Sequence, residues 1–567
     1  MEVQKKRWHI PQVDDELVKN LQQELKIHPK ICRILVARGI TTFEEAKDFF
    51  RPSLQHLHNP FLMKDMDKAV SRILLAFERQ EQILVFGDYD VDGTTAVSLM
   101  YSFLKNIYAH VSYYIPDRYS EGYGISMEGI DFAKANGFTL MIALDCGIKA
   151  HDKIAYANTL GVDFVICDHH LPEATLPEAI AILDQKREDC PYPYKELSGC
   201  GIGFKLAQAL SMEMNLEIAH VHAYMDLVAV SIASDIVPIT GENRTLAYFG
   251  LQHINANPRP GLKALLEIAQ TKERILDISD LVFVIGPRIN AAGRIAHGSE
   301  AVNLLIETDA ILAKEKAEKI QLNNDTRKEE DKSTTEEALE MLRNNIDTNK
   351  KRSTVLFQPH WHKGVIGIVA SRLIEKYYKP TIILTESNGT LSGSARSIHD
   401  FDVYEAIKDC SEHLSQFGGH KYAAGLTLQP AKLEAFIEKF EQVVAEHITE
   451  DQLYPKVDID GELELSDITP SFLKIIDQMA PFGPGNMRPV WMTTSVQDNG
   501  RTRIIKEDHL KLEVFKIGQP AVSGIGFNMK YYLDYIKDKK SFDICYQLYE
   551  NEWNGNANVE IRLKDIR

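Results

Sequence analysis

Between residues 82 and 184, apolar runs of strand length alternate with segments that have helical periodicity. This alternation constrains the fold more than any other feature, because strands separated by helices pair in parallel through βαβ units. The runs are continuously apolar, which is typical of strands buried on both faces. The expected strands are 82–87, 110–116, 138–147, 162–170 and 179–184. We therefore predict an α/β fold with a doubly wound parallel sheet.

The chain has 567 residues, too many for one hydrophobic core, and its composition changes along its length. Residues 308–348 are highly charged and lack Pro and Gly, which predicts one or two helices that connect domains. A second α/β pattern follows, and from about residue 455 short strands with turn residues predict a closed β-barrel of the OB kind. The expected parts are a helical segment at 1–50, an α/β domain at 51–305, a connecting helix at 306–350, a second α/β domain at 351–450 and an OB-fold domain at 451–567.

Charge and cysteine content exclude some classes of protein. The net charge of -17 argues against a protein that coats nucleic acid non-specifically, although it permits a local basic groove. The seven cysteines include no CxxC pair, which indicates reduced, buried thiols. No stretch approaches the roughly 18 apolar residues of a membrane span. We expect a cytoplasmic protein that does not contact a membrane.

The segment VFGDYDVDGTT places Asp88, Asp90 and Asp92 directly after the first expected strand. In a doubly wound sheet, ligands bind beyond the carboxyl ends of the strands. Two neighbouring strands end in similar residues, with Asp145 after one and Asp168, His169 and His170 after the other. So much negative charge at one edge would repel itself unless cations were bound there. The sequence therefore predicts divalent metal ions at this edge.

The residue types favour Mn²⁺ or Mg²⁺. A calcium loop needs ligands spread over twelve residues with a closing Glu, and zinc normally recruits Cys or more His. Oxygen ligands with one or two imidazoles suit Mn²⁺ or Mg²⁺, and the imidazoles favour Mn²⁺. Any one of these aspartates alone could cap a helix or shape a turn. Capping accounts for neither the alternating aspartates nor the Asp-His-His triplet.

Eight motifs give the chain a resemblance to a known family. GDYDVDGTT, LDCG, CDHH and SIASDIVP resemble, in order and spacing, the four motifs of the DHH phosphoesterase superfamily. GPRINAAGR, WHKGVIGIVASR, SGSARS and FGGHKYAAG resemble its RecJ branch, the bacterial single-strand-specific 5′ to 3′ DNA exonucleases. The resemblance runs from about residue 50 to the C-terminus. It implies a DHH catalytic domain at 51–305 and a DHH-associated substrate-binding domain at 351–450.

The resemblance also implies a site with two metal ions and a catalytic His170 facing the scissile phosphate. The implied metal ligands are Asp90, Asp92, Asp145, His169 and Asp235, with Asp145 between the two ions. Many DHH enzymes carry a His four residues before the position of Asp90, but Phe86 stands there in this chain. Asp88 or water is then the expected replacement, and a turn-capping role is the alternative for Asp88.

Substrate binding is expected from basic and glycine-rich segments outside the acidic edge. Glycines let backbone amides approach phosphate oxygens, and a guanidinium binds a phosphate bidentately. The residues expected to bind a 5′-phosphate are Arg288, Arg294, Ser394, Arg396, Gly418, Gly419 and His420. The alternative for each is a glycine-rich turn with surface arginines. In the barrel, the candidates for binding a single strand are Arg501, Arg503, Lys506 and Phe515, although the barrel could equally dock a protein. The glycines of SGCGIGF, residues 198–204, predict only a turn before a helix.

Three functions compete. We favour a two-metal exonuclease that degrades single-stranded DNA from the 5′ end to 5′-mononucleotides in recombination and repair. The resemblance adds single-strand-binding protein and a RecQ-type helicase as partners, and we expect a monomer. The second function is a phosphodiesterase for short oligonucleotides or cyclic dinucleotides, which the barrel and the chain length oppose. The third is a non-catalytic DHH scaffold that binds DNA or replication proteins, which would be expected to lose the acidic ligands that this chain retains.

Overall fold

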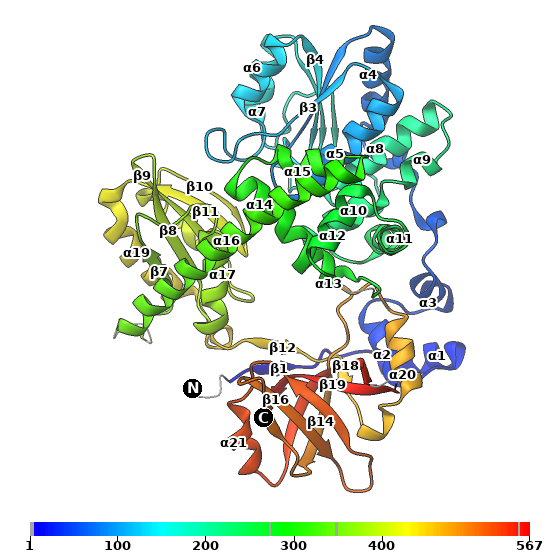
Figure 1. Ribbon diagram of the computed structural model, residues 1–567, viewed down its shortest axis with the longest axis vertical. Helices are drawn as coiled ribbons and strands as arrows, with labels where there is room; N and C mark the ends of the chain where they lie inside the picture. Colours follow the sequence, from blue (N-terminus) through cyan, green and yellow to red (C-terminus); the bar gives the residue numbers. More distant parts are fainter. Residues whose placement is uncertain (1–4, 272–273, 346–349, 554–555) are drawn as a thin grey trace. The chain divides into compact units, whose positions relative to one another are not determined.

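The computed structural model describes residues 5–271, 274–345, 350–553 and 556–567 (Figure 1). The chain divides into two compact units. The first unit comprises Asp48–Thr326 and Ala480–Met487, and the second contains the rest of the described chain. The boundary at residue 326 lies inside helix α16 (Ala310–Asn344), which is the single long helix expected for the connecting segment. Residues 346–349 of that expected segment lie outside the described residues.

A five-stranded sheet forms the centre of the first unit, in the order β3-β2-β4-β5-β6. All neighbouring strands are parallel. The strands are β2 (Gln82–Gly87), β3 (Val111–Tyr114), β4 (Phe138–Leu144), β5 (Asp163–Cys167) and β6 (Ala181–Leu183). The helices that join or flank them are α4 (Met66–Glu78), α5 (Val91–Ile107), α6 (Met127–Ala135), α7 (His151–Thr159) and α8 (Gly199–Glu213).

The two faces of this sheet bury different side chains, as the continuous apolar runs require. Ile83 and Val85 of β2 join a core that includes α4, α5 and α8. Leu84 and Phe86, which alternate with them, join a second core that includes α6 and α7. Helices therefore cover both faces of a parallel sheet, and the predicted doubly wound α/β fold is confirmed.

A helical layer completes the first unit. Its helices are α10 (Met225–Ser234), α11 (Gly241–Ala256), α12 (Pro260–Ile268), α14 (Gly286–Ile295) and α15 (Ser299–Leu305). Side chains from α10, α12, α14 and α15 belong to the same core as α5 and α8. Arg244 of α11 is buried, and its guanidinium donates to the carbonyl oxygens of Phe49, Ala480 and Pro481. These bonds connect residues 480–487 to the rest of the first unit.

The second unit contains a five-stranded sheet with parallel and antiparallel strands, in the order β10-β11-β9-β8-β7. We call this sheet and the helices that cover it the mixed-sheet domain. Its strands are β7 (Thr354–Phe357), β8 (Thr381–Ser387), β9 (Thr390–Arg396), β10 (Gln416–His420) and β11 (Ala423–Leu428). Ile383 packs with α17 (Ile366–Lys376) and the end of α16, whereas Ile382 and Leu384 pack with α18 (Val403–Lys408) and α19 (Leu433–His447). The second α/β domain is thus also covered on both faces.

A closed barrel forms from the C-terminal strands. Its strands are β14 (Trp491–Asp498), β16 (His509–Phe515), β17 (Val522–Gly526), β18 (Phe542–Trp553) and β19 (Asn556–Ile566). They pair in the order β14-β18-β19-β17-β16, and pairing between β16 and β14 closes the circuit. The first of the short strands expected from about residue 455 are β12 (Lys456–Asp458) and β13 (Gly461–Glu462). The chain turns between them at Asp460, whose carboxylate accepts from the Val490 N–H.

No helix within the described part of the chain is both long enough and apolar enough to cross a membrane.

Candidate metal centre and phosphate site

The register of the parallel sheet brings the acidic residues to one level. Gly87 pairs with Leu144, and Leu144 pairs with Cys167. The residues that follow these three are Asp88, Asp145 and Asp168. Three neighbouring strands therefore end at the same height, which is why residues far apart in sequence meet at this edge.

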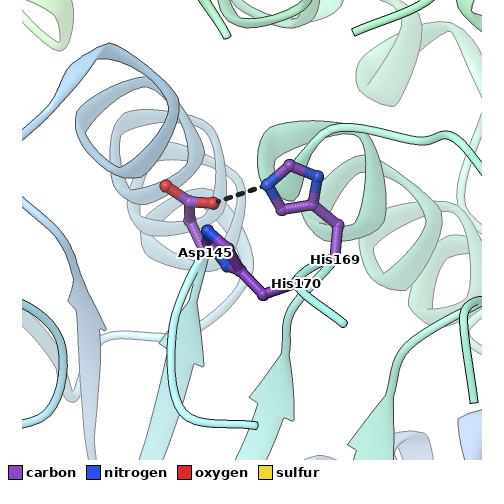
Figure 2. Close-up of side chains that lie close together, drawn as sticks. All are labelled: Asp145, His169 and His170. Carbon is purple, nitrogen blue, oxygen red and sulfur yellow. Dashed lines mark ion pairs between the residues drawn. The ribbon is translucent and has the colours of Figure 1, made fainter. Parts of the chain in front are cut away.

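His169 lies at the centre of a carboxylate cluster. Its Nε2 atom is 3.2 Å from Asp145 Oδ1, 3.5 Å from Asp235 Oδ2 and 3.8 Å from Asp92 Oδ2. Figure 2 shows Asp145 and His169 pointing toward each other from the ends of neighbouring strands, with His170 beside them. Two groups have ligand atoms within 4.8 Å of one another, Asp92 with His169 and Asp235, and Asp145 with His169 and His170. His169 belongs to both.

The buried atoms of this cluster lack hydrogen bonds. Asp145 Oδ1 and His169 Nε2 are buried without a hydrogen-bond partner among the described residues, although they lie 3.2 Å apart. Leaving a buried carboxylate oxygen unsatisfied costs free energy, so such atoms are rare without a reason. Ligand-type atoms that approach this closely without hydrogen bonds have the spacing needed to bind one cation. The donor set of three carboxylates and an imidazole fits Mn²⁺ or Mg²⁺.

Burial and mutual repulsion shift the pKa values of these residues away from their usual ranges. Burial raises the pKa of Asp145 and of Asp235 well above the usual range of an aspartate. Repulsion from the charge of Asp92 raises both pKa values further. Burial and Asp90 raise the pKa of Asp92 to about 6. Burial lowers the pKa of His169 to about 3, which keeps the ring neutral and able to bind a metal.

Asp90 and Asp88 lie next to the cluster. Asp90 caps α5, and its Oδ1 accepts from the Gly93 N–H at 3.0 Å. Its charge acts on Asp92, Asp145 and Asp235, but among the described residues its carboxylate is in neither candidate group. Asp88 is fully buried, and both of its carboxylate oxygens lack a hydrogen-bond partner in the described ranges. Asp88 therefore does not cap the following turn with its side chain, and it too is in neither group.

His170 is held by Asp168 and faces outward. Its Nδ1 lies 2.7 Å from Asp168 Oδ1, and its side chain is 43% exposed. Burial alone would lower the pKa of His170, but the hydrogen bond and charge of Asp168 outweigh it and raise the pKa to about 9. The Tyr123 hydroxyl lies 3.5 Å from His170 Nε2. At neutral pH His170 is therefore a cation with an Nε2–H available near the metal candidates.

Ser394 and Arg396 form a second cluster, in the mixed-sheet domain. The Arg396 guanidinium donates to Ser394 Oγ at 3.1 Å and to the Ala395 carbonyl oxygen at 2.8 Å. A Cβ on Gly367, in the first turn of α17, would lie 2.8 Å from both Arg396 Nη2 and Ser394 Oγ. Burial lowers the pKa of Arg396, and no carboxylate in the described ranges forms an ion pair with it. A half-buried guanidinium beside a helix N-terminus is an arrangement that can bind an anion.

The glycines of FGGHKYAAG lie on the same sheet as Ser394 and Arg396. Gly418 is opposite Gly425, and Gly425 is opposite Ser394. His420 is opposite Ala423, and Ala423 is opposite Arg396. Directly paired residues share a face of the sheet. A Cβ at Gly418 or Gly425 would meet nothing within 4 Å, whereas Gly419 (φ +145°) is crowded by Ala423 and Ala424. Small residues therefore leave an open strip of sheet beside Ser394.

The other basic candidates are placed less distinctively. Arg288 and Arg294 lie on α14 of the first unit, where Arg288 Nε donates to Gln321 Oε1 at 2.9 Å. Arg288 also donates to the Val284 carbonyl oxygen at 2.7 Å. In the barrel, Arg501 lies 3.4 Å from Glu513, which offsets its charge. The remaining barrel candidates are Arg503 on β15 (Arg503–Ile505), Lys506 in the following turn and Phe515 at the end of β16.

Sequence reasoning did not anticipate several contacts around the candidate metal ligands. Asp168 stands in the CDHH motif, but its role in holding His170 depends on side-chain geometry. Tyr123 lies in a loop with no motif to mark it. Gly199 of SGCGIGF, expected only to shape a turn, donates its N–H to Asp92 Oδ2 at 2.7 Å.

Comparisons with known proteins decide the family. Residues 82–232 match the DHH family N-terminal domain, residues 350–446 the DHHA1 domain and residues 459–565 the RecJ OB domain. The chain is 35% identical to the single-stranded-DNA-specific exonuclease RecJ of Bacillus subtilis strain 168, over 99% of this chain and 71% of that protein. It belongs to the RecJ family.

Solved structures of the RecJ family agree. The crystal structure of RecJ from Thermus thermophilus in complex with Mn²⁺ matches with a TM-score of 0.85 and 26% identity, over 99% of this chain and 79% of that chain. The structure with Mg²⁺ from the same organism matches with a TM-score of 0.79 and 25% identity, over 99% of this chain and 78% of that chain. The resemblance seen in the motifs is confirmed, and so are the predicted DHH, DHH-associated and OB folds. The predicted enzyme class, a metal-dependent exonuclease specific for single-stranded DNA, is confirmed with them.

Proposed function

We propose that the protein hydrolyses single-stranded DNA from its 5′ end and releases 5′-mononucleotides, with two divalent cations bound at the edge of the first sheet. The observation that carries this proposal is the approach of three carboxylates to His169 Nε2 within 3.2–3.8 Å, with buried ligand atoms that lack hydrogen bonds to the described residues. Membership of the RecJ family supports the substrate class.

The residues that would hold Mn²⁺ or Mg²⁺ are the predicted set of Asp90, Asp92, Asp145, His169 and Asp235. The two candidate groups share His169, whose Nε2 would hold one ion, and the carboxylates of Asp92, Asp145 and Asp235 would supply oxygen ligands around it. When bound, the two cations would supply a nucleophile from water near neutral pH and offset charge on the phosphate. Asp88 is fully buried and is repelled by Asp90, so a cation nearby would stabilise its charge. Asp88 or water is retained as the proposed replacement for the His that Phe86 displaces.

His170 would contact the scissile phosphate. Asp168 holds its Nδ1, so the ring presents Nε2–H outward, and the raised pKa keeps that proton in place at neutral pH. A cationic donor at this position can bind a non-bridging phosphate oxygen and stabilise the extra charge of the transition state. His170 itself does not need to transfer the proton for this role.

The 5′-phosphate would bind at Ser394, Arg396 and the first turn of α17. A terminal phosphate carries more charge than an internal one and satisfies a guanidinium that has no carboxylate partner among the described residues. The open strip at Gly418 and Gly425 would let the DNA backbone lie against the sheet. Binding of the terminal phosphate in this way would select strands by their 5′ end. We assign Arg288, Arg294 and His420 to flanking phosphate contacts.

We also propose domain limits, a cellular location, a role for the barrel and protein partners. The domain limits predicted from sequence, 1–50, 51–305, 306–350, 351–450 and 451–567, are retained as proposals. We place the activity in the cytoplasm because all seven cysteines are free and buried. The barrel would bind the strand leaving the site, and single-strand-binding protein and a RecQ-type helicase are the partners proposed from the family resemblance.

A time course with Mn²⁺ tests the proposal. Single strands labelled at the 5′ or the 3′ end are digested beside a blunt duplex. The 5′ label should appear at once as mononucleotide, the 3′-labelled strand should shorten progressively, and the duplex should survive. Asp145→Ala should abolish the reaction, whereas Asp131→Ala, at an exposed position on α6, should not. Digestion of both labelled strands from the 3′ end, or full activity of Asp145→Ala, contradicts the proposal.

A further inference from the structure

The SGCGIGF segment begins helix α8, and its first residues contact two of the candidate metal ligands. We propose that Ser198, Gly199, Cys200 and Ser231 form a support that orients Asp92 and Asp145 for metal binding. These are positioning residues and not ligands. The inference rests on the metal centre of the proposed function and adds the residues that determine its geometry.

Asp92 is fixed by three hydrogen bonds from this support. The Gly199 N–H donates to Asp92 Oδ2 at 2.7 Å, and the Cys200 N–H donates to Oδ1 at 2.7 Å. The Ser231 hydroxyl donates to Oδ1 at 2.7 Å. Asp92 is 2% exposed, so these bonds are not exchanged for water. They set the carboxylate plane and leave Oδ2 facing His169.

The two serines are connected to each other. Ser231 Oγ lies 2.6 Å from Ser198 Oγ, and both side chains are fully buried. A hydroxyl has one proton, and the Asp92 carboxylate can only accept. The Ser231 hydroxyl is the donor to both Asp92 Oδ1 and Ser198 Oγ, so its proton is shared between these two acceptors. Ser198 Oγ also accepts from the Gly201 N–H at 3.1 Å. Ser198 thus caps α8 and connects the start of that helix to Ser231.

Gly199 also limits the position of Asp145. A Cβ at Gly199 would lie 2.6 Å from both Cβ and Oδ1 of Asp145, closer than such atoms approach in proteins. The start of α8 therefore packs directly against the Asp145 side chain. Only glycine can donate to Asp92 and leave room for Asp145. One residue thereby couples ligands that come from two different strands.

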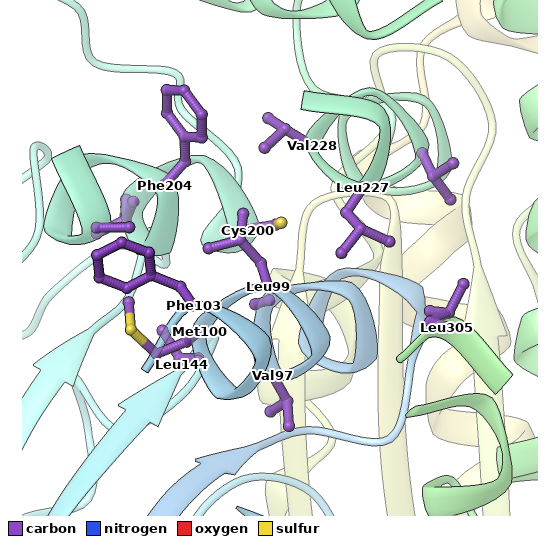
Figure 3. Close-up of a cluster of buried hydrophobic side chains, with 14 of the residues drawn as sticks. Val97, Leu99, Met100, Phe103, Leu144, Cys200, Phe204, Leu227, Val228 and Leu305 are labelled. Atoms are coloured by element: carbon purple, nitrogen blue, oxygen red, sulfur yellow. The ribbon is translucent and has the colours of Figure 1, made fainter. Parts of the chain in front are cut away.

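Helix α8 is rigid enough to serve as this support. Cys200 and Phe204 of α8 pack with Leu99 and Phe103 of α5 in the core of the first unit (Figure 3). Asp92 lies in the first turn of α5, so the two helices that carry the donor and the acceptor are packed together. The positive end of the α8 dipole also favours the charged form of Asp92. Partners of this kind orient ligands and typically change metal affinity when they are removed.

Mn²⁺ binding to the full-length protein, measured by calorimetry, tests the role of Ser231. Ser231→Ala should weaken Mn²⁺ binding by on the order of 10- to 100-fold. The matched control is Ser211→Ala. Ser211, on α8, is as fully buried as Ser231 on α10, but its hydroxyl has no hydrogen-bond partner among the described residues. The control should bind as the wild type does. Ser231→Thr keeps the hydroxyl and should also retain wild-type affinity, whereas equal loss in both Ser231 variants would overturn the inference.

Gly199 is tested in the same assay. Gly199→Ala should weaken Mn²⁺ binding because it displaces Asp145. Gly203→Ala is the control on the same helix, where an added Cβ would meet only the tip of Leu144 at 3.2 Å among the described residues. The melting temperature in EDTA shows whether each variant is folded. Wild-type affinity in folded Ser231→Ala and Gly199→Ala overturns the inference. Absence of Mn²⁺ binding in the wild type would instead refute the proposed metal centre.

Discussion

The charge of Asp235 should destabilise the protein when no metal is bound. Its carboxylate oxygen lies within 4.8 Å of that of Asp92. At this distance and an effective dielectric constant of ~20, the repulsion is about 3.5 kcal/mol. The Asp235 side chain is 31% exposed, which reduces this to roughly 1–3 kcal/mol. Asp235 also occupies the C-cap of α10, the end of a helix where a negative charge is unfavourable.

Asp235→Asn should therefore stabilise the protein in EDTA and weaken its response to Mn²⁺. The variant should melt at a higher temperature than the wild type at pH 8 without metal. With Mn²⁺ at 100 times its dissociation constant, the free energy of unfolding of the wild type rises by about 2.7 kcal/mol. The wild type should then melt at a higher temperature than the variant. Thermal unfolding followed by circular dichroism measures both states.

The stabilisation that Asp235→Asn gives in EDTA should increase with pH. Burial and Asp92 raise the pKa of Asp235 in the folded protein, so its ionisation costs stability. This cost is absent below the usual aspartate pKa of about 3.9 and grows as the pH rises through the folded value. The advantage of Asp235→Asn in EDTA should therefore be small at pH 4 and larger at pH 8. A variant that is equally or less stable than the wild type in EDTA at pH 8 would refute the reasoning.

Three further predictions concern the phosphate site and the core. Arg396→Ala should lower kcat/KM about 10- to 100-fold for 5′-phosphorylated strands, because a charge-assisted hydrogen bond contributes about 1.5–3 kcal/mol. The loss of kcat/KM should be smaller for 5′-hydroxyl strands, and an equal loss on both would mean that Arg396 is a general backbone contact. Gly367→Ala, which places a Cβ 2.8 Å from Arg396 and Ser394, should raise KM for DNA in steady-state assays without changing Mn²⁺ affinity. Lys205→Met should lower the free energy of unfolding, measured with urea, by about 3–5 kcal/mol because it leaves the fully buried Glu242 carboxylate without its cation; a loss below about 1 kcal/mol would contradict this.

Local sequence pattern was sufficient for the sheet of the first unit and for the meeting of its acidic residues. A strand buried on both faces is continuously apolar, and the run at 82–87 shows this directly. Once the strands are parallel and in register, Asp88, Asp145 and Asp168 must follow at one level. The approach of Asp92, Asp145 and His169 was expected for this reason. Asp235 follows α10 and was expected only from the motif resemblance. The role of all four as ligands stays a prediction.

Contacts that depend on packing between distant segments could not be predicted. Ser231 contacts Asp92 across 139 positions of sequence, and Gly199 contacts it across 107. A buried serine in an apolar helix looks like any small core residue, and glycines before a helix look like a turn. The significance of both comes from the approach of α8 and α10 to the start of α5, which side-chain shape determines and periodicity does not.

Two carboxylates from neighbouring strand ends have opposite electrostatic environments, and this difference separates a supporting residue from a candidate ligand. Asp168 accepts from the N–H groups of Ile148, His169 and His170 and from the His170 ring. Burial alone would raise its pKa, but these donors outweigh it and hold the pKa below the usual range. Asp145, at the same level one strand away, has a buried oxygen with no donor among the described residues and a pKa well above that range. The charge of Asp168 is already compensated by protein donors, whereas Asp145 Oδ1 has no donor among the described residues, as expected for the ligand that we propose. Adding Mn²⁺ should therefore change the environment of Asp145 and leave that of Asp168 nearly unchanged.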